Sequence, residues 1–295
     1  MAVREAGQAR RRGASARLTI PCRRARLAYR GRPLVMGILN VTPDSFSDGG
    51  RYLGVGAAVA RGIAMAEQGA DLLDVGGEST RPGAPAVPLE EELARVVPVI
   101  GALSRRVRIP ISVDTSKAAV AEQAIGAGAS IINDVTALRG DPGMARCAAA
   151  SRAGVILMHM RGTPRTMQRA PRYGNAVEEI GAFLLEAAAR AERSGVDRRR
   201  ILIDPGLGFG KTLTHNLQLL ARLHALVAKG YPVVLGASRK SFIGRVLDAG
   251  TEDRLAGSLA CASVAAEAGV HVVRVHDVRE TVQLLTVLHA IRSET

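Results

Sequence analysis

The feature that most constrains the fold of this chain is a regular alternation between short apolar runs and segments of helical length. Eight such runs, of two to six residues, are separated by amphipathic or Ala-rich stretches. Runs this short and this apolar predict strands that are buried on both faces. The predicted strands are 34–39, 72–75, 111–113, 131–132, 155–158, 201–203, 233–235 and 272–275.

The stretches between these runs predict crossover helices. They are residues 55–68, 89–103, 117–127, 142–151, 176–194, 213–228 and 254–268, with a last helix over 278–291. Strands that alternate with helices pair in parallel, because the crossover returns the chain to the same edge of the sheet. Eight units in about 260 residues predict a single α/β domain, a (β/α)8 TIM barrel. An open, doubly wound sheet is the alternative.

Composition fits such a barrel and limits the cellular setting. Hydrophobic residues make up 47% of the 295, enough to bury a large core, and aromatic residues only 3%. No apolar run approaches the length of a transmembrane helix, so we expect no membrane association. The three cysteines, at 22, 147 and 261, lack the spacing of a metal site and favour a reducing, cytoplasmic location.

Positive charge is concentrated at the N-terminus. Residues 1–30 contain nine arginines and a single acid, Glu5, so they carry +8 of the net charge of +13. We expect a basic, flexible extension over 1–30 and a barrel domain over 31–295. A transit peptide or a nucleic-acid-binding tail are alternatives. The chain has no recognisable RNA-binding module, so we expect no nucleic-acid partner.

Polar side chains follow almost every predicted strand. In a parallel barrel, ligands bind at the C-terminal ends of the strands, where the loops gather. Burying so many polar groups together is costly unless they pair or serve a ligand. The predicted site is therefore the barrel mouth, with a mutually satisfied polar plug as the alternative. The positions are Asn40, 76–81, Asp114, Asn133, Asp134, His159, Asp204, 238–240, Arg274, His276 and Asp277.

These residues divide into two chemical groups. Carboxylates accept parallel N–H bonds from a planar, guanidine-like edge, and an amide and an ammonium can read the remaining acceptors of such a ring. That group is Asp114, Asn133, Asp204 and Lys240. The second group suits a phosphate or diphosphate with Mg²⁺, which keeps few protein ligands. It comprises Asn40, Thr80, Arg81, Arg274 and His276.

The segment 204–212, DPGLGFGKT, imitates a phosphate-binding loop but does not meet its requirements. A P-loop needs glycine at the position of Pro205, and a dinucleotide-binding fingerprint needs glycine at the position of Lys211. No serine or cysteine nucleophile with a paired base is evident, which argues against covalent catalysis. For His159 we favour a supporting role behind the site over a direct one.

Eight ordered motifs show that residues 34–291 resemble the dihydropteroate synthase family. They are LVMGILNVTPDSFSDGG (34–50), GADLLDVGGESTRPGA (69–84), ISVDTSKAAVAEQAI (111–125), IINDV (131–135), LMHMRGTPRTMQ (157–168), ILIDPGLGFGKT (201–212), GASRKSFIG (236–244) and RVHDV (274–278). The resemblance implies a homodimeric barrel enzyme of folate synthesis. It would join p-aminobenzoate to 6-hydroxymethyl-7,8-dihydropterin diphosphate, with sulfonamides as competitive inhibitors. A folate–corrinoid methyltransferase is the rival reading, but that reaction needs no diphosphate subsite.

The resemblance also implies roles for individual residues. Asp114, Asn133, Asp204 and Lys240 would hold the pterin, with Met158 and Phe209 lining its slot and Gly236 and Ser241 among the binding positions. Asn40 would bind Mg²⁺, and Thr80, Arg274 and His276 the diphosphate. The p-aminobenzoate would lie near Thr80, Arg81, Pro82, Phe46 and Ser241.

The expected chemistry is an SN1-like displacement at the pterin methylene carbon. Departure of diphosphate leaves a delocalised cation that carboxylates such as Asp114 would stabilise, while Mg²⁺, Arg274 and His276 stabilise the departing anion. The catalytic set is therefore Asp114, Lys240, Arg274 and His276. Loop 41–50, with Asp44 and Phe46, is expected to act as a lid that excludes water.

Overall fold

The computed structural model describes residues 17–41, 51–80 and 83–294, apart from the side chains of 51–53. The expected lid residues Asp44 and Phe46, and also Arg81 and Pro82, lie outside the described residues. In the described part of the chain, none of the helices is long and apolar enough to cross a membrane.

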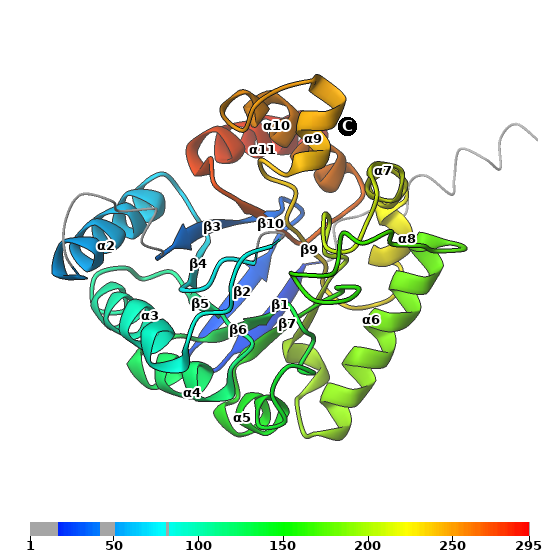
Figure 1. The fold of residues 1–295 in the computed structure, drawn as a ribbon. Helices are drawn as coiled ribbons and strands as arrows, with labels where there is room; N and C mark the ends of the chain where they lie inside the picture. The colour runs from blue at the N-terminus through cyan, green and yellow to red at the C-terminus, as the bar shows by residue number, and fades with distance from the viewer. Residues whose placement is uncertain (1–16, 42–50, 81–82, 295) are drawn as a thin grey trace, which may run out of the picture.

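Eight parallel strands form a ring, as predicted (Figure 1). Each pairs with its neighbour in sequence, and β10 returns to pair with β3. A single bridge between Ile203 and Val233 links β8 to β9 and closes the barrel. The strands are β3 (Leu34–Asn40), β4 (Leu72–Gly76), β5 (Ile111–Asp114), β6 (Ile131–Asp134), β7 (Gly154–Met158), β8 (Ile201–Asp204), β9 (Val234–Leu235) and β10 (Val272–Val275).

Helices surround this ring (Figure 1). The predicted helix over 213–228 is divided at Arg222, whose backbone leaves the helical region with φ −122° and ψ 27°. The short helix that follows Lys240 was not predicted. The helices are α2 (Arg51–Glu67), α3 (Leu89–Leu103), α4 (Ala118–Ala127), α5 (Met144–Ser151), α6 (Ala176–Arg193), α7 (Leu213–Ala221), α8 (Leu223–Val227), α9 (Ser241–Leu247), α10 (Leu255–Glu267) and α11 (Val278–Ser293), with 3-10 turns at Arg198–Arg200 and Glu252–Arg254.

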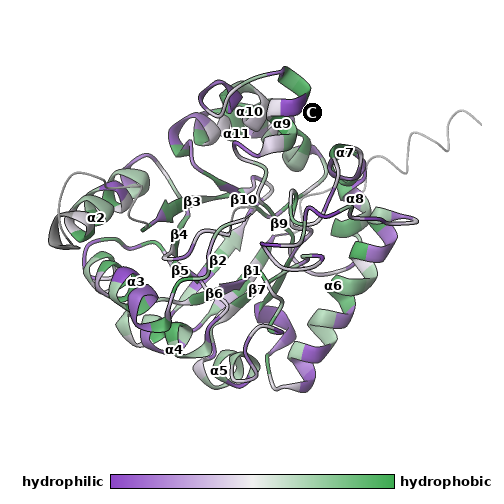
Figure 2. Ribbon diagram, in the orientation of Figure 1, coloured by the Kyte–Doolittle hydropathy of each residue, from purple (hydrophilic) through white to green (hydrophobic). Residues whose placement is uncertain are grey.

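The apolar side chains form two layers. Alternate strand residues such as Val35 and Leu39 pack outward against the helices. Their neighbours Leu34 and Met36 belong to a second cluster, formed with residues of the other strands. Because both faces of each strand are covered, the strands read as continuous apolar runs. Long helices such as α3 and α6 carry both hydrophobic and hydrophilic residues, as amphipathic helices do (Figure 2).

A hairpin closes the end of the barrel opposite the strand C-termini. Strands β1 (Leu18–Cys22) and β2 (Ala25–Tyr29) pair antiparallel. Ile20 and Leu27 join the inner apolar cluster, and the Arg23 amide donates to the Arg152 carbonyl just before β7. The expectation of a flexible extension over 1–30 is therefore wrong for residues 18–29. Apolar residues alternate along both strands, a strand pattern that the density of arginine obscures.

The hairpin should contribute to the stability of the barrel. Ile20 is fully buried, so Ile20→Ala is expected to lower the free energy of unfolding by about 3 kcal/mol. Thr19→Ala, at an exposed position of the same strand, should change it by less than about 0.5 kcal/mol. Chemical denaturation of the two variants measures both values. Equal stability of the two would show that the hairpin is not part of the core.

Candidate active site

Carboxylate and amide side chains converge at the mouth of the barrel. Asp114 and Asp204 are the last residues of β5 and β8, and Asn133 pairs in register with Asp114 on the neighbouring strand. All three are at most 9% exposed. The predicted ring-binding carboxylates and amide are thus brought together by strand register.

Arg274 crosses the mouth and joins two of the carboxylates. It lies within β10, and its guanidinium donates from Nε to Asp74 Oδ2 at 2.6 Å and from Nη2 to Asp114 Oδ2 at 2.8 Å. Asn133 Nδ2 also donates to Asp74 Oδ2, at 3.0 Å. The guanidinium that we expected to bind phosphate is therefore held here by two carboxylates.

Asp74 is the site residue that the sequence reasoning missed. It lies inside β4 and is fully buried. Its other oxygen, Oδ1, has no hydrogen-bond partner among the described residues. The sequence did contain an indication of this role, because Asp74 is a carboxylate inside an otherwise apolar strand. A buried carboxylate is costly without a partner.

The close packing of charges shifts their pKa values. Burial, reinforced by the nearby carboxylate of Asp74, raises the pKa of Asp114 to about 7, against the opposing effect of Arg274. Burial likewise raises the pKa of Asp204, and the Lys240 ammonium opposes it. Burial lowers the pKa of Lys240 to about 8, opposed by Asp204. The mouth can therefore hold or release a proton near neutral pH.

An apolar wall lies beside these charged groups. Met158 packs in a buried cluster with Met160 and Met167, and Phe209 lies against it. Lys240 Nζ is 4.8 Å from the centre of the Phe209 ring, a cation–π contact. Gly236 lies between Lys240 and Arg274, where a Cβ would make ordinary van der Waals contact with both side chains, 3.8 Å from Lys240 Nζ and 3.9 Å from Arg274 Cβ. A flat heteroaromatic ring with a polar edge fits these surroundings.

The expected anion-binding residues lie around the rim. Asn40 ends β3 and is half-buried, and Thr80 is half-buried in the loop after β4. His276 follows β10, and its Nδ1 lies 3.0 Å from Ser238 Oγ. Arg239 is paired with Asp277 at 2.5 Å, which ties the loop after β9 to the loop after β10.

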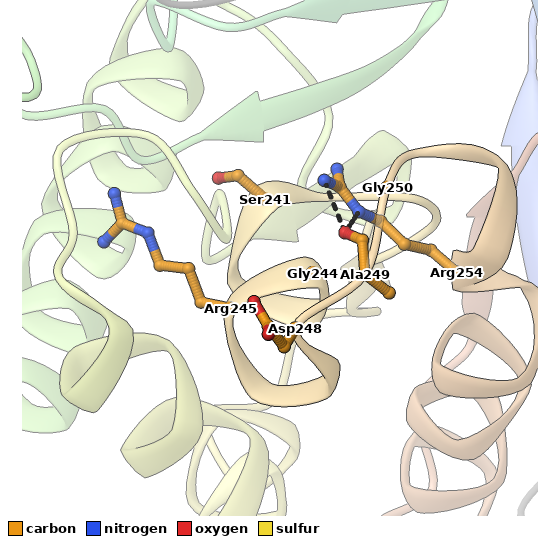
Figure 3. A pocket seen from close by; sticks show the side chains of 7 residues that line it. All are labelled: Ser241, Gly244, Arg245, Asp248, Ala249, Gly250 and Arg254. Carbon is orange, nitrogen blue, oxygen red and sulfur yellow. Dashed lines mark hydrogen bonds between the residues drawn. The ribbon is translucent and has the colours of Figure 1, made fainter.

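Ser241 begins α9 and lines a surface depression of about 510 Å³ next to Lys240 (Figure 3). Across α9, the Arg254 guanidinium donates to the carbonyls of Ala249 and Arg239, so it braces the loop after β9. The lining of the depression comes from α9 and the segment that follows it, and it includes none of Asp74, Asp114 and Asp204.

An ion cluster supports the loop that carries Thr80. Lys117 Nζ contacts the carboxylates of both Glu78 and Glu92. Glu92 belongs to α3 and is fully buried, whereas Glu78 precedes Thr80 in the loop after β4. The cluster thus fixes the base of this loop to α3 and to the start of α4.

His159 lies behind the apolar wall. Its Nδ1 is 2.9 Å from Lys211 Nζ, and its ring meets Phe183 edge-on at 4.8 Å. Burial, with repulsion from Lys211, lowers the pKa of His159 to about 2, so the imidazole is neutral. This placement fits the supporting role that we favoured for it.

The described residues contain no group of three or more His, Cys, Asp or Glu side chains arranged to hold a metal ion. Asn40 offers one amide oxygen at the rim. Such a donor set suits Mg²⁺ only where a substrate supplies further oxygens, which is how that ion usually binds.

A barrel mouth that places buried carboxylates beside an apolar wall suits a flat ring with a polar edge. A pterin is such a ring, and the family that matches this chain is named for binding it. Residues 36–276 match the family described as pterin binding enzyme, so the chain is a barrel of the pterin-binding class. The dihydropteroate synthase of Escherichia coli (strain K12) is 50% identical over 258 residues, which cover 88% of this chain and 91% of that protein. The chain belongs to the dihydropteroate synthase family.

Solved structures agree in fold. The dihydropteroate synthase of Xanthomonas albilineans with 4-aminobenzoic acid superposes with a TM-score of 0.88 at 51% identity, covering 94% of this chain and 99% of that one. The same enzyme with 7,8-dihydropteroate gives 0.85 at 49% identity, covering 93% and 98%. The Yersinia pestis synthase with a sulfonamide drug complex gives 0.88 at 46% identity, covering 94% and 100%.

The raised pKa of Asp114 predicts a pH dependence of stability. Its pKa is about 7 in the folded protein against 3.8 for the free side chain. The folded state therefore binds the extra proton between these values, and stability should fall as pH rises through that window. Asp114→Asn should flatten this fall in denaturation curves recorded between pH 4.5 and 8, whereas Asp253→Asn, at an exposed position, should not. An unchanged slope in Asp114→Asn would contradict the shift.

Proposed function

We propose that this chain is a dihydropteroate synthase, a transferase that condenses 6-hydroxymethyl-7,8-dihydropterin diphosphate with p-aminobenzoate to give 7,8-dihydropteroate and diphosphate. The observation that carries the proposal is the match to enzymes of that name at about half identity over nearly the whole chain. The mouth supports it, because Asp114, Asn133 and Asp204 converge there beside Phe209. The methyltransferase alternative finds no such support in these relatives.

The two groups at the mouth suit the two parts of the first substrate. The amino and ring N–H groups of the pterin are donors that match the buried carboxylates of Asp114 and Asp204 and the amide of Asn133. Lys240 would donate to the ring acceptors, with Gly236 beside its ammonium group. The faces of the ring would contact Met158 and Phe209.

The chemical step transfers the methylene carbon from oxygen to nitrogen. The carbon–oxygen bond to diphosphate breaks and its electron pair leaves with the diphosphate. The amine lone pair of p-aminobenzoate then forms the carbon–nitrogen bond, and the amine loses a proton. Asp114 would stabilise the intermediate cation, while Arg274 and His276 would stabilise the departing anion. The hydrogen bond that Arg274 Nε donates to Asp74 holds this side chain across the mouth before substrate arrives.

Mg²⁺ belongs to this proposal as the partner of the diphosphate. Asn40 would supply one ligand and the substrate the others, in keeping with the sparse donor set of the described rim. When bound, the ion neutralises the charge of the leaving group.

The second substrate would lie at the side of the mouth near Thr80 and Ser241. Arg81, Pro82 and Phe46 complete the proposed p-aminobenzoate subsite, with Asp44 and Phe46 as parts of the closing loop. These four lie outside the described residues. The Xanthomonas and Yersinia structures, solved with 4-aminobenzoic acid and a sulfonamide, support this substrate and sulfonamide competition for its place.

We also propose a cytoplasmic homodimer. Among the described residues, all the large exposed apolar side chains except Leu89 on α3 lie on neighbouring helices: Leu217 on α7, Val246 and Leu247 on α9, Val264 on α10, and Val287 and Ile291 on α11. A second copy of the chain would cover this face, and light scattering should then give twice the mass of 31.0 kDa. The free state of Cys22, Cys147 and Cys261 accords with a reducing compartment.

The function is tested by assaying dihydropteroate formation from the two substrates with Mg²⁺. Wild-type protein should form the product, and Asp114→Asn and Lys240→Ala should each lower kcat/KM by about 10²- to 10³-fold. Lys229→Ala is the matched control, because Lys229 pairs with Glu178 on the outer surface. A wild-type protein that forms no product would refute the function, and full activity in Lys240→Ala would refute its role.

The SN1-like order predicts that diphosphate release does not require the amine. In a single-turnover experiment without p-aminobenzoate, water should trap the cation, giving diphosphate and 6-hydroxymethyl-7,8-dihydropterin. Asp114→Asn should slow this release, because it removes the stabilising carboxylate. Diphosphate release that depends strictly on the amine would exclude the dissociative order.

A further inference from the structure

The segment 204–212 resembles a phosphate-binding loop in sequence. In the structure, hydrogen bonds from side chains to its backbone carbonyls hold it in place. Its glycines at 206, 208 and 210 all have positive φ, at 63°, 84° and 65°. Four consecutive carbonyl oxygens each accept a side-chain hydrogen bond. The pairs are Leu207 with Lys240, Gly208 with Gln168 at 2.6 Å, Phe209 with Lys211 at 2.9 Å, and Gly210 with Tyr173 at 2.8 Å.

Lys211 is the buried member of these donors. It is 3% exposed, and its Nζ lies within hydrogen-bond distance of the Phe209 carbonyl, the His159 carbonyl at 3.4 Å and His159 Nδ1 at 2.9 Å. A lysine ammonium has three N–H donors, and three acceptors surround it here. Its partners belong to two loops, one after β7 and one after β8.

The two loops are in close contact where Lys211 joins them. The His159 amide donates to the Asp204 carbonyl at 2.9 Å. A Cβ at Gly206 would lie 2.1 Å from the His159 carbonyl oxygen, and a Cβ at Gly210 would lie 2.6 Å from that of Arg161. A displacement of the Phe209 loop away from the segment of Met158 and His159 would therefore stretch the bonds from Lys211 to His159.

The backbone end of Lys211 is equally well anchored. Thr212 caps α7 through a reciprocal capping box with His215. Asn216 of the same helix accepts from the Gly208 amide at 2.7 Å and is 2% exposed. Burial lowers the pKa of Lys211 well below its usual value. Burying this ammonium group is costly, and its hydrogen bonds to Phe209 and His159 offset that cost.

We propose that Lys211 is a positioning residue for the pterin slot. Its ammonium group bonds both to the Phe209 carbonyl and to His159, and so holds the Phe209 ring at a fixed distance from Met158. The inference rests on the proposed function, since it assigns the slot to the pterin. Lys211 touches no substrate. It acts through Phe209, whose ring also carries the cation–π contact with Lys240.

The test compares Lys211→Met with wild type and with the surface control Lys229→Met. The KM for pterin diphosphate should rise about 10-fold in Lys211→Met, while the KM for p-aminobenzoate and kcat change by less than about 3-fold. Binding of 6-hydroxymethylpterin, measured by calorimetry, should weaken by a similar factor. Lys229→Met should behave as wild type in both measurements.

A purely structural role would lower the fraction of active protein, and hence kcat, without separating the two KM values. An unchanged pterin affinity in folded Lys211→Met, or equal rises in both KM values, would overturn the proposal. If Lys211→Met does not fold, Tyr173→Phe releases only the Gly210 carbonyl and should raise the pterin KM by about 3-fold, with no rise refuting the proposal.

Measuring pterin binding by calorimetry distinguishes a failure of this inference from a failure of the proposed function. A wild-type protein that binds the pterin but forms no dihydropteroate refutes the synthase activity. Weakened pterin binding in Lys211→Met would still support the positioning role in that case.

Discussion

The ion pairs of Arg274 are the interaction on which the mouth of this barrel depends. One guanidinium bonds to Asp74 on β4 and Asp114 on β5, although it lies on β10, at the other end of the sequence. Two buried carboxylates so close together would repel each other without a cation between them. Burying such charges is costly unless they are paired, so barrel closure and charge pairing depend on each other.

Charged side chains also hold the loops around the mouth in place. Lys117 holds the loop after β4 through Glu78 and Glu92, and Arg239 ties the loops after β9 and β10 through Asp277. Lys211 joins the loops after β7 and β8. The loops after β4, β7, β8, β9 and β10 are thus each tied by a charged side chain to a neighbouring element. Donors and acceptors held in advance are what stabilise developing charge during a reaction.

The convergence of the strand-end residues could be predicted from the geometry of a parallel barrel, without knowing their chemical roles. In a parallel barrel, every strand ends at the same face, so Asp114, Asn133 and Asp204 had to converge once the alternation was recognised. Asp74 was missed because it lies within a strand, where its pairing with Arg274 depends on a partner distant in sequence. The hairpin over 18–29 was missed because its strands are only five residues long and Arg23, Arg24 and Arg26 make the segment resemble the basic extension before it.

The amino-acid sequence by itself determined the barrel, the face on which its site lies, and the resemblance to a synthase family, because strand period and strand-end polarity are local properties. Tertiary structure alone decided which charges meet. Arg274, whose proposed partner is the diphosphate, is bonded in this structure to Asp74 and Asp114. Lys211, a mismatch in a nucleotide-binding pattern, is bonded to Phe209 and His159. Such pairings depend on distances across the closed ring, which no local pattern encodes.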